Sequence, residues 1–270
     1  MERQLNPAEF RIPIIDWPSD VGGYRGIPVD SVDPRNSEPL VDVSALGIAA
    51  ESHYARIDGG NWPYNQAISG SLKRVWARKG VVERLVRINQ RLAPMGFELF
   101  VWDGYRPIET QSGLWDYFEA AVRRERPVAG EADIEAAVVK YVSDPRDFSR
   151  DDSTTWPAHS TGGALDLTLR DRATRQLLDM GAAFDEMAAI SHSDALERHL
   201  AAGDIKETNA PLTNRRILHW AMSTEGFVNY PLEYWHFDWG NQFYVHNLGV
   251  QHKPAPAAAW YGYVDPPTSD

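Results

Sequence analysis

The sequence predicts an α+β fold, with a small central antiparallel sheet and flanking helices. Segments with helical periodicity and short apolar segments alternate irregularly, without the repeated strand–helix–strand order of a parallel sheet. The 18 prolines and 20 glycines indicate many turns and loops, which argues against a helical bundle. A chain of 270 residues can bury a sizeable core in one large domain or two small ones.

The first half of the predicted core contains one strand and three helices. Apolar residues at near-helical spacing predict a helix over residues 80–92, which a Pro-Met-Gly sequence ends. The aromatic run over residues 97–102 leads into an Asp-Gly turn, a pattern typical of a strand. Two further helices are predicted over residues 109–124 and 131–141.

The second half of the core contains two predicted strands and one helix. Residues 164–169 form an apolar run directly after a Gly-Gly turn, which indicates a strand. Residues 214–224 present an apolar helical face, and Gly226 ends that helix. The aromatic residues of 234–239 predict a second strand.

Both ends of the chain differ from this core in composition. Residues 1–50 are rich in proline, aspartate and glycine and lack sustained periodicity, so we expect an arm that packs on the domain. Residues 253–270 contain a proline–alanine run and predict an irregular tail. The central domain is therefore expected to span residues 51–252.

Composition excludes several classes of protein. The formal net charge of −11 argues against a protein whose main partner is nucleic acid or an anionic membrane. The absence of cysteine excludes disulfides, thiolate metal sites and cysteine nucleophiles. The N-terminal residues lack the pattern of a signal peptide, and no apolar run approaches the ~18 residues of a membrane helix. A cytoplasmic location is the default expectation.

Two separated clusters carry the residue types of a hydrolytic zinc site. The first places His159 seven positions before Asp166, and the second places Glu233 three positions before His236. Catalytic zinc takes three ligands of the His, Asp or Glu type, and a further glutamate can act as general base. Spacing alone leaves the alternative open, because a histidine is more often a surface or satisfied core residue than a ligand. Glycines between His159 and Asp166 favour a loop followed by a strand over a helix.

A third segment, with the sequence Trp-Asp-Gly-Tyr-Arg-Pro, lies at the end of the first predicted strand. Arg106 precedes a proline and is therefore held in an extended conformation, which would direct a fixed positive charge into a cleft. The alternative is a structural salt bridge with Asp103. The residues alone leave both interpretations open.

These segments together resemble the D-alanyl-D-alanine dipeptidases of glycopeptide resistance, which are zinc enzymes related to the D,D-carboxypeptidases and the hedgehog domain. The resemblance covers about residues 55–245 and preserves the order of the segments. It rests on WDGYRP at 102–107, HSTGGALDLTL at 159–169, MGAAFD at 180–185, NRRIL at 214–218 and LEYWHF at 232–237.

The resemblance implies a role for each of six residues. It makes His159, Asp166 and His236 the ligands of one zinc ion. Glu233 becomes the catalytic base, and Arg106 polarises the scissile carbonyl and its oxyanion. Asp185 is expected to hold the α-ammonium of the substrate or to shape that pocket. The implied partner is a small dipeptide, and the chain is expected to be a monomer or a homodimer.

One departure from the family pattern keeps other functions open. The family commonly has serines just before the first histidine, where this chain has Trp-Pro-Ala. Cleavage of a different dipeptide, D,D-carboxypeptidase or amidase action on cell-wall peptides, and a non-catalytic zinc-binding module are the alternatives. Pocket walls are expected from aromatic residues that could equally belong to the core: Trp62, Tyr64, Trp115 and Trp156.

Overall fold

The protein was analysed as a computed structural model that describes residues 6–16 and 22–268, and its α+β class agrees with the prediction. The central sheet has five strands in the order β2-β4-β5-β7-β6. Three strand pairs are antiparallel, but β2 pairs with β4 in parallel, so the sheet is mixed rather than wholly antiparallel. Its strands are β2 (Ala49–Ala50), β4 (Phe97–Asp103), β5 (Ala164–Asp171), β6 (Val228–Asn229) and β7 (His236–Asp238).

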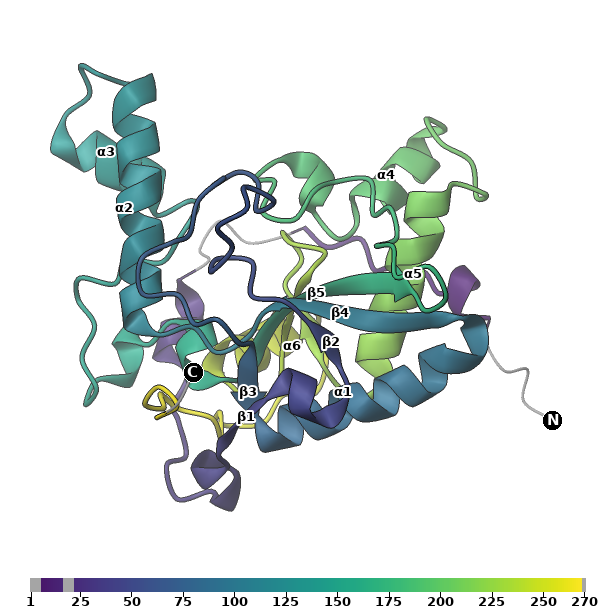
Figure 1. Ribbon diagram of the computed structural model, residues 1–270, viewed down its shortest axis with the longest axis horizontal. Coiled ribbons are helices and arrows are strands. Elements are labelled where there is room, and N and C mark those ends of the chain that lie inside the picture. Colours follow the sequence, from purple (N-terminus) through teal and green to yellow (C-terminus); the bar gives the residue numbers. More distant parts are fainter. Residues whose placement is uncertain (1–5, 17–21, 269–270) are drawn as a thin grey trace.

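Six α-helices surround this sheet in the described part of the chain (Figure 1). They are α1 (Lys79–Leu92), α2 (Ile108–Glu125), α3 (Glu131–Val138), α4 (Ala195–Ala202), α5 (Ala210–Thr224) and α6 (Gln242–Val250). A second, two-stranded sheet pairs β1 (Leu40–Asp42) antiparallel with β3 (Trp76–Arg78). Helices α2 and α3 extend away from the sheet at the upper left of Figure 1.

The ends of several elements differ from the predicted ends. Helix α5 begins before residue 214, because the Asn209 side chain caps the Leu212 amide and Pro211 occupies the first turn. Helix α3 ends at Val138 instead of residue 141. After Val138 the chain tightens, because the Tyr141 backbone N–H donates to the Val138 carbonyl in an i→i+3 hydrogen bond.

The last predicted strand is also shorter than expected. Tyr234 donates its backbone N–H to Ser191, outside the sheet, so the ladder of β7 begins only at His236. Helix α6 was not predicted, because it is buried on most sides and lacks an amphipathic pattern. The eight-residue helix α4 was also missed, being too short for a clear period.

The apolar core lies on one face of the sheet and the polar site on the other. Alternation along β4 and β5 directs Leu99, Leu167 and Leu169 to the core, where they are fully buried. Helix α1 packs on β4, and α5 contacts β5. Asp166 is buried as well, but the alternation along β5 sets it on the opposite face. Asp103 joins it there because the register of β4 shifts between Val101 and Asp103. The core therefore supports the sheet from behind the site.

Both terminal segments pack on the central domain. Strands β1 and β2 belong to residues 1–50 and pair with β3 and β4, and the short 3₁₀ turn Pro7–Glu9 contacts α5. In the tail, Ala259 forms a parallel bridge with Val29, and Tyr261 is almost fully buried. The described parts of the arm and the tail therefore contact each other as well as the domain.

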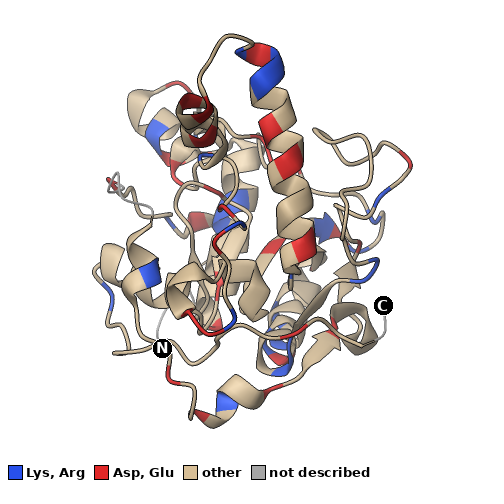
Figure 2. Cartoon of the chain, turned by 90° about the vertical axis from the view of Figure 1, so that its left-hand side faces the viewer, with Lys and Arg blue, Asp and Glu red and all other residues tan. Residues whose placement is uncertain are grey.

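Acidic and basic residues are interspersed along the chain in the view of Figure 2. For example, the Arg123 guanidinium of α2 is ion-paired with Glu119 of the same helix and with Glu131 at the start of α3. Within residues 6–16 and 22–268, no helix combines the length and apolar character needed to cross a membrane.

Candidate functional site

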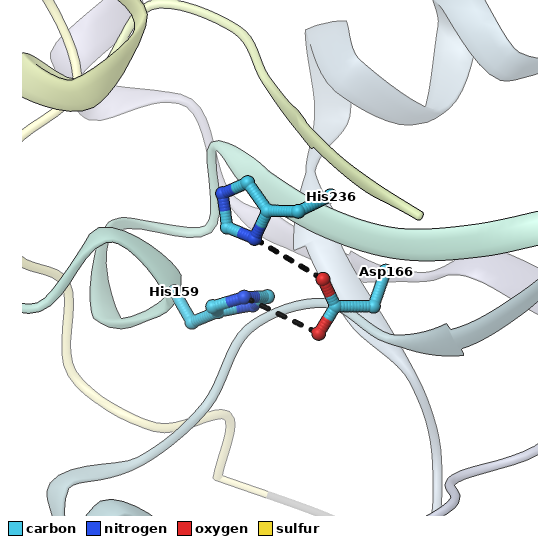
Figure 3. A group of neighbouring side chains, drawn as sticks. All are labelled: His159, Asp166 and His236. Atoms are coloured by element: carbon cyan, nitrogen blue, oxygen red, sulfur yellow. Dashed lines mark hydrogen bonds and ion pairs between the residues drawn. The ribbon is translucent and has the colours of Figure 1, made fainter. Parts of the chain in front are cut away.

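Three of the predicted site residues converge at one end of the central sheet. One potential ligand atom each from His159, Asp166 and His236 lies within 4.8 Å of the other two, and all three side chains are buried. The His159 Nε2 atom lies 3.4 Å from one Asp166 oxygen, and the His236 Nδ1 atom lies 3.1 Å from the other (Figure 3). The two clusters that are far apart in sequence therefore form one site.

Strand register explains why Asp166 and His236 meet. Asp166 lies directly opposite His236 on β7 and opposite Asp103 on β4, so three polar residues form one row across the sheet. Side chains directly opposite on antiparallel strands are close enough to interact. An irregularity between Val101 and Asp103 shifts the register of β4 and brings Asp103 into this row.

The loop before β5 carries His159 to the end of this row. His159 lies in the short 3₁₀ turn Ala158–Thr161, which ends at Gly162 with φ of +71°. A left-handed conformation of this kind favours glycine. At Gly163, an added Cβ would lie 2.6 Å from the Trp239 carbonyl oxygen, so a larger residue does not fit. The Gly-Gly pair thus forms the predicted turn between the histidine and the strand.

Hydrogen bonds to the outer ring nitrogens orient both histidines. His159 Nδ1 lies 2.8 Å from the Gly104 carbonyl, which accepts its proton and leaves Nε2 facing Asp166. His236 Nε2 lies 3.0 Å from Asp238, which leaves Nδ1 facing the site. Such outer contacts fix the tautomer of a metal-binding histidine. Asp238 was missed by the sequence reasoning, although its i,i+2 spacing from His236 in a strand was a usable signal.

Glu233 lies beside the cluster without belonging to it. Its carboxylate oxygen is 3.8 Å from His236 Nδ1, and its side chain is 23% exposed. The residue lies in the turn before β7, where its backbone N–H donates to the Tyr230 carbonyl. Burial raises the pKa of Glu233 to about 7, although nearby His236 opposes this shift. A carboxyl group with such a pKa is suited to both accept and donate a proton near neutral pH.

Arg106 forms the predicted salt bridge and also borders the site. Its guanidinium lies 2.8 Å from Asp103 and 3.5 Å from Asp166, and it donates to Gln111 and to the Tyr54 hydroxyl. Although burial opposes it, these surroundings hold the pKa of Arg106 above its ordinary value. A structural salt bridge and a charge directed into a cleft are thus compatible, because the salt bridge with Asp103 holds the Arg106 guanidinium beside the site.

Asp185 lies on the far side of Arg106, where two tyrosines hold its carboxylate. The Tyr64 hydroxyl donates to it at 2.9 Å and the Tyr54 hydroxyl at 3.1 Å. Burial, with the nearby Asp166 carboxylate, raises the pKa of Asp185 to about 8. Its backbone is left-handed, with φ of +58°, a strained conformation that often occurs at binding sites.

The electrostatics of the cluster fit a bound cation. Burial and Arg106 lower the pKa of His159 to about 3, so this imidazole is neutral. Burial opposes ionisation of Asp166, but the two histidines and Arg106 lower its pKa to about 2. Burial also opposes protonation of His236, yet Asp238 and Asp166 raise its pKa. Two imidazole nitrogens and one carboxylate oxygen form a donor set of the kind that binds catalytic zinc.

A cavity of about 390 Å³ opens over these residues. All six predicted site residues line this cavity: His159, Asp166, His236, Glu233, Arg106 and Asp185. Of the four aromatic residues considered as walls, Tyr64 lines the cavity, together with Tyr54 and Tyr230, which were not predicted. The other three lie elsewhere: Trp62 is half exposed, Trp115 is core, and Trp156 packs near Tyr263.

The sequence of this chain is similar to those of known peptidases. The sequence profile of the Peptidase_M15 family, described as D-ala-D-ala dipeptidase, matches residues 40–253. A D-alanyl-D-alanine dipeptidase of Synechocystis is 28% identical over 90% of this chain and 96% of its own length. One from Streptomyces coelicolor is 30% identical over 73% of this chain and 89% of its own length.

Among solved structures, a vancomycin-resistance D,D-pentapeptidase VanY mutant in complex with Zn(II) is 14% identical. The superposition covers 72% of this chain and 89% of the VanY chain, with a TM-score of 0.33. This likeness is too low to bear on function. The extent of the profile match and the agreement with the similar dipeptidases are sufficient to assign the family without this structure. The chain belongs to the D-ala-D-ala dipeptidase family of M15 peptidases.

Proposed function

We propose that this protein hydrolyses a D,D-dipeptide such as D-alanyl-D-alanine in a zinc-dependent reaction. The observation that carries the proposal is the convergence of His159, Asp166 and His236 with Glu233 and Arg106 in one cavity. These groups provide a metal-binding set, a proton carrier and a fixed cation. The family to which the chain belongs supports the choice of substrate.

The metal-binding set would be His159 through Nε2, His236 through Nδ1 and Asp166 through its carboxylate, with one zinc ion per chain. Both imidazoles already use their other nitrogen in a hydrogen bond, as metal-binding histidines commonly do. Zinc, when bound, supplies Lewis-acid chemistry that acidifies water and polarises a carbonyl group.

Two residues of the chain act on the reacting atoms. The Glu233 carboxylate accepts a proton from the attacking water and then delivers it to the nitrogen of the leaving amino acid, so the amide bond breaks without net proton uptake. Arg106 donates N–H groups toward the substrate oxygen, on which negative charge develops. In a buried site such a fixed charge is effective, because no solvent must reorganise.

Asp185 binds the free α-ammonium of the dipeptide. The raised pKa of its carboxyl group reflects burial and the neighbouring Asp166 rather than a lack of polar partners. A substrate cation in contact with Asp185 would favour the ionised form and offset that burial. The hydroxyl groups of Tyr54 and Tyr64 hold the carboxylate in position. This arrangement selects substrates with a free amino terminus.

A substrate panel tests the proposed function. Zinc-loaded protein is incubated with D-Ala-D-Ala, L-Ala-L-Ala, a mixed-chirality dipeptide and an N-acylated tripeptide that ends in D-Ala-D-Ala. We expect cleavage of D-Ala-D-Ala and none of the acylated peptide. Cleavage of the acylated peptide would indicate a carboxypeptidase instead, and cleavage of nothing would indicate a binding module.

Two variants should separate proton transfer from metal binding. Glu233→Gln is expected to retain zinc but to lose about 10²–10⁴-fold in kcat, because the general base is removed while the ligands remain. His159→Ala is expected to lose zinc, as measured by elemental analysis after dialysis. Near-wild-type turnover of Glu233→Gln, or full zinc occupancy of His159→Ala, would contradict these assignments.

A further inference from the structure

The N-terminal segment of residues 22–30 is attached to three separate parts of the molecule. The Gln242 side chain of α6 donates to the backbone carbonyls at positions 25 and 27. The Arg25 guanidinium donates to the Thr154 carbonyl at 2.8 Å. Backbone hydrogen bonds on both sides of Ala259 join the segment to the tail. These attachments hold the segment against the site, although the family match begins only at residue 40.

This segment places Tyr24 in the wall of the active-site cavity. Tyr24 is 7% exposed, and its ring lies 4.9 Å from the ring of Phe243. Phe243 lies 5.7 Å from His236 and 4.8 Å from Tyr230, centroid to centroid. All four of these residues line the cavity. Tyr24 therefore belongs to an aromatic wall that ends at a proposed zinc ligand.

The Tyr24 wall and the proposed ammonium site are connected to different residues of the metal-binding cluster. A chain of polar contacts runs from Asp166 through Arg106 and Tyr54 to Asp185. A chain of ring contacts runs from His236 through Phe243 to Tyr24. In the proposed reaction the scissile bond lies at the cluster and the ammonium group at Asp185. The leaving residue then extends toward the Tyr24 wall.

We propose that Tyr24 forms the outer wall of the subsite for the leaving amino acid and limits the size of that residue. This inference rests on the proposed function. The wall is built from the aromatic rings of Tyr24, Tyr230 and Phe243, which suit an apolar side chain of the leaving residue.

Truncation of the ring tests this subsite. Tyr24→Ala and the more conservative Tyr24→Leu are compared with wild type for kcat/KM on D-Ala-D-Ala and on D-Ala-D-Phe. We expect the ratio of D-Ala-D-Phe to D-Ala-D-Ala to rise about tenfold or more, a range that pocket size commonly controls. Tyr24→Phe keeps the ring and should leave the ratio near wild type. Tyr263→Ala removes an aromatic residue of the tail that lies outside the cavity and serves as the matched control.

A binding measurement separates this inference from the proposed reaction. In a Glu233→Gln background, which blocks turnover, calorimetry gives the dissociation constants of the two dipeptides with and without Tyr24→Leu. Zinc content and melting temperature are checked for each variant. A shift of the affinity ratio toward D-Ala-D-Phe supports the wall even if wild type proves inactive. An unchanged ratio, or no binding of either dipeptide, overturns it.

Discussion

Arg78 and Arg106 are two buried arginines that both contact the loop that carries His159. The backbone N–H of Arg106 donates to the His159 carbonyl, and the Arg78 guanidinium donates to the Thr161 carbonyl at 2.8 Å. Their other acceptors differ. Arg106 faces carboxylates, whereas Arg78 donates to backbone carbonyls at positions 36, 38 and 262.

This difference separates a charge that we propose for chemistry from a charge that joins segments of the chain. Carbonyls of the arm, the tail and the site loop all meet at Arg78, and burial lowers its pKa, although nearby Tyr261 and Glu38 oppose the shift. The surroundings of Arg106 instead raise its pKa, and its side chain borders the cavity. The same residue type therefore joins chain segments at one position and presents a fixed charge at the other.

The largest effect expected from this comparison of the two arginines is on turnover and would be produced by Arg106→Lys. Lysine keeps the charge but loses the planar fork of N–H donors, so it cannot hold Asp103 and face the substrate together. We expect kcat/KM to fall about 10²–10³-fold, with zinc still bound. Arg78→Lys is the matched control and should retain kcat within a few-fold. Full activity of Arg106→Lys would break the comparison.

The second effect concerns stability and would be produced by Arg78→Met. The substitution leaves buried carbonyls of three chain segments without a donor, so the free energy of unfolding should fall by about 3 kcal/mol or more. Urea denaturation measures it. Arg123→Met, at an exposed ion pair on α2, is the control and should change stability by less than about 1 kcal/mol. An equal decrease in the free energy of unfolding of the two variants would contradict the structural role assigned to Arg78.

A smaller effect should appear in the pH dependence of stability. His219 is buried beside Phe10 and Phe237, and burial lowers its pKa to about 3. Between about pH 6.5 and 3, His219 therefore binds a proton in the unfolded chain but stays neutral in the folded chain. Stability should fall as the pH decreases from 6.5 toward 3, by up to about 1.4 kcal/mol per pH unit.

His219→Leu cannot bind that proton and should show a shallower loss of stability over this range. His199→Leu removes an exposed histidine that pairs with Asp204, and it serves as the control. Urea unfolding at several pH values measures both slopes. Identical slopes in wild type and His219→Leu would show that this buried imidazole does not contribute.

Local patterns pointed to the residues that cluster as candidate metal ligands, whereas contacts between distant residues were missed. A histidine, a glycine turn and a strand that contains Asp166 could be predicted directly, because each depends on a few neighbouring residues. The Tyr54 and Tyr64 partners of Asp185 lie 131 and 121 positions away from it. No local period reports such a contact. The same limit applies to Arg78, whose short sequence context resembles any strand end.

By itself, the sequence determined the available chemistry: imidazoles, carboxylates and one fixed cation, in segments typical of a zinc dipeptidase. Side-chain type and local spacing carry that information, because donor chemistry belongs to the residue. Only the tertiary structure decided which groups meet. His236 reaches Asp166 across 70 positions through strand register, and Asp238 fixes its ring. Register and docking of the terminal segments depend on packing of the whole chain, since each of those contacts joins distant residues whose burial is decided together.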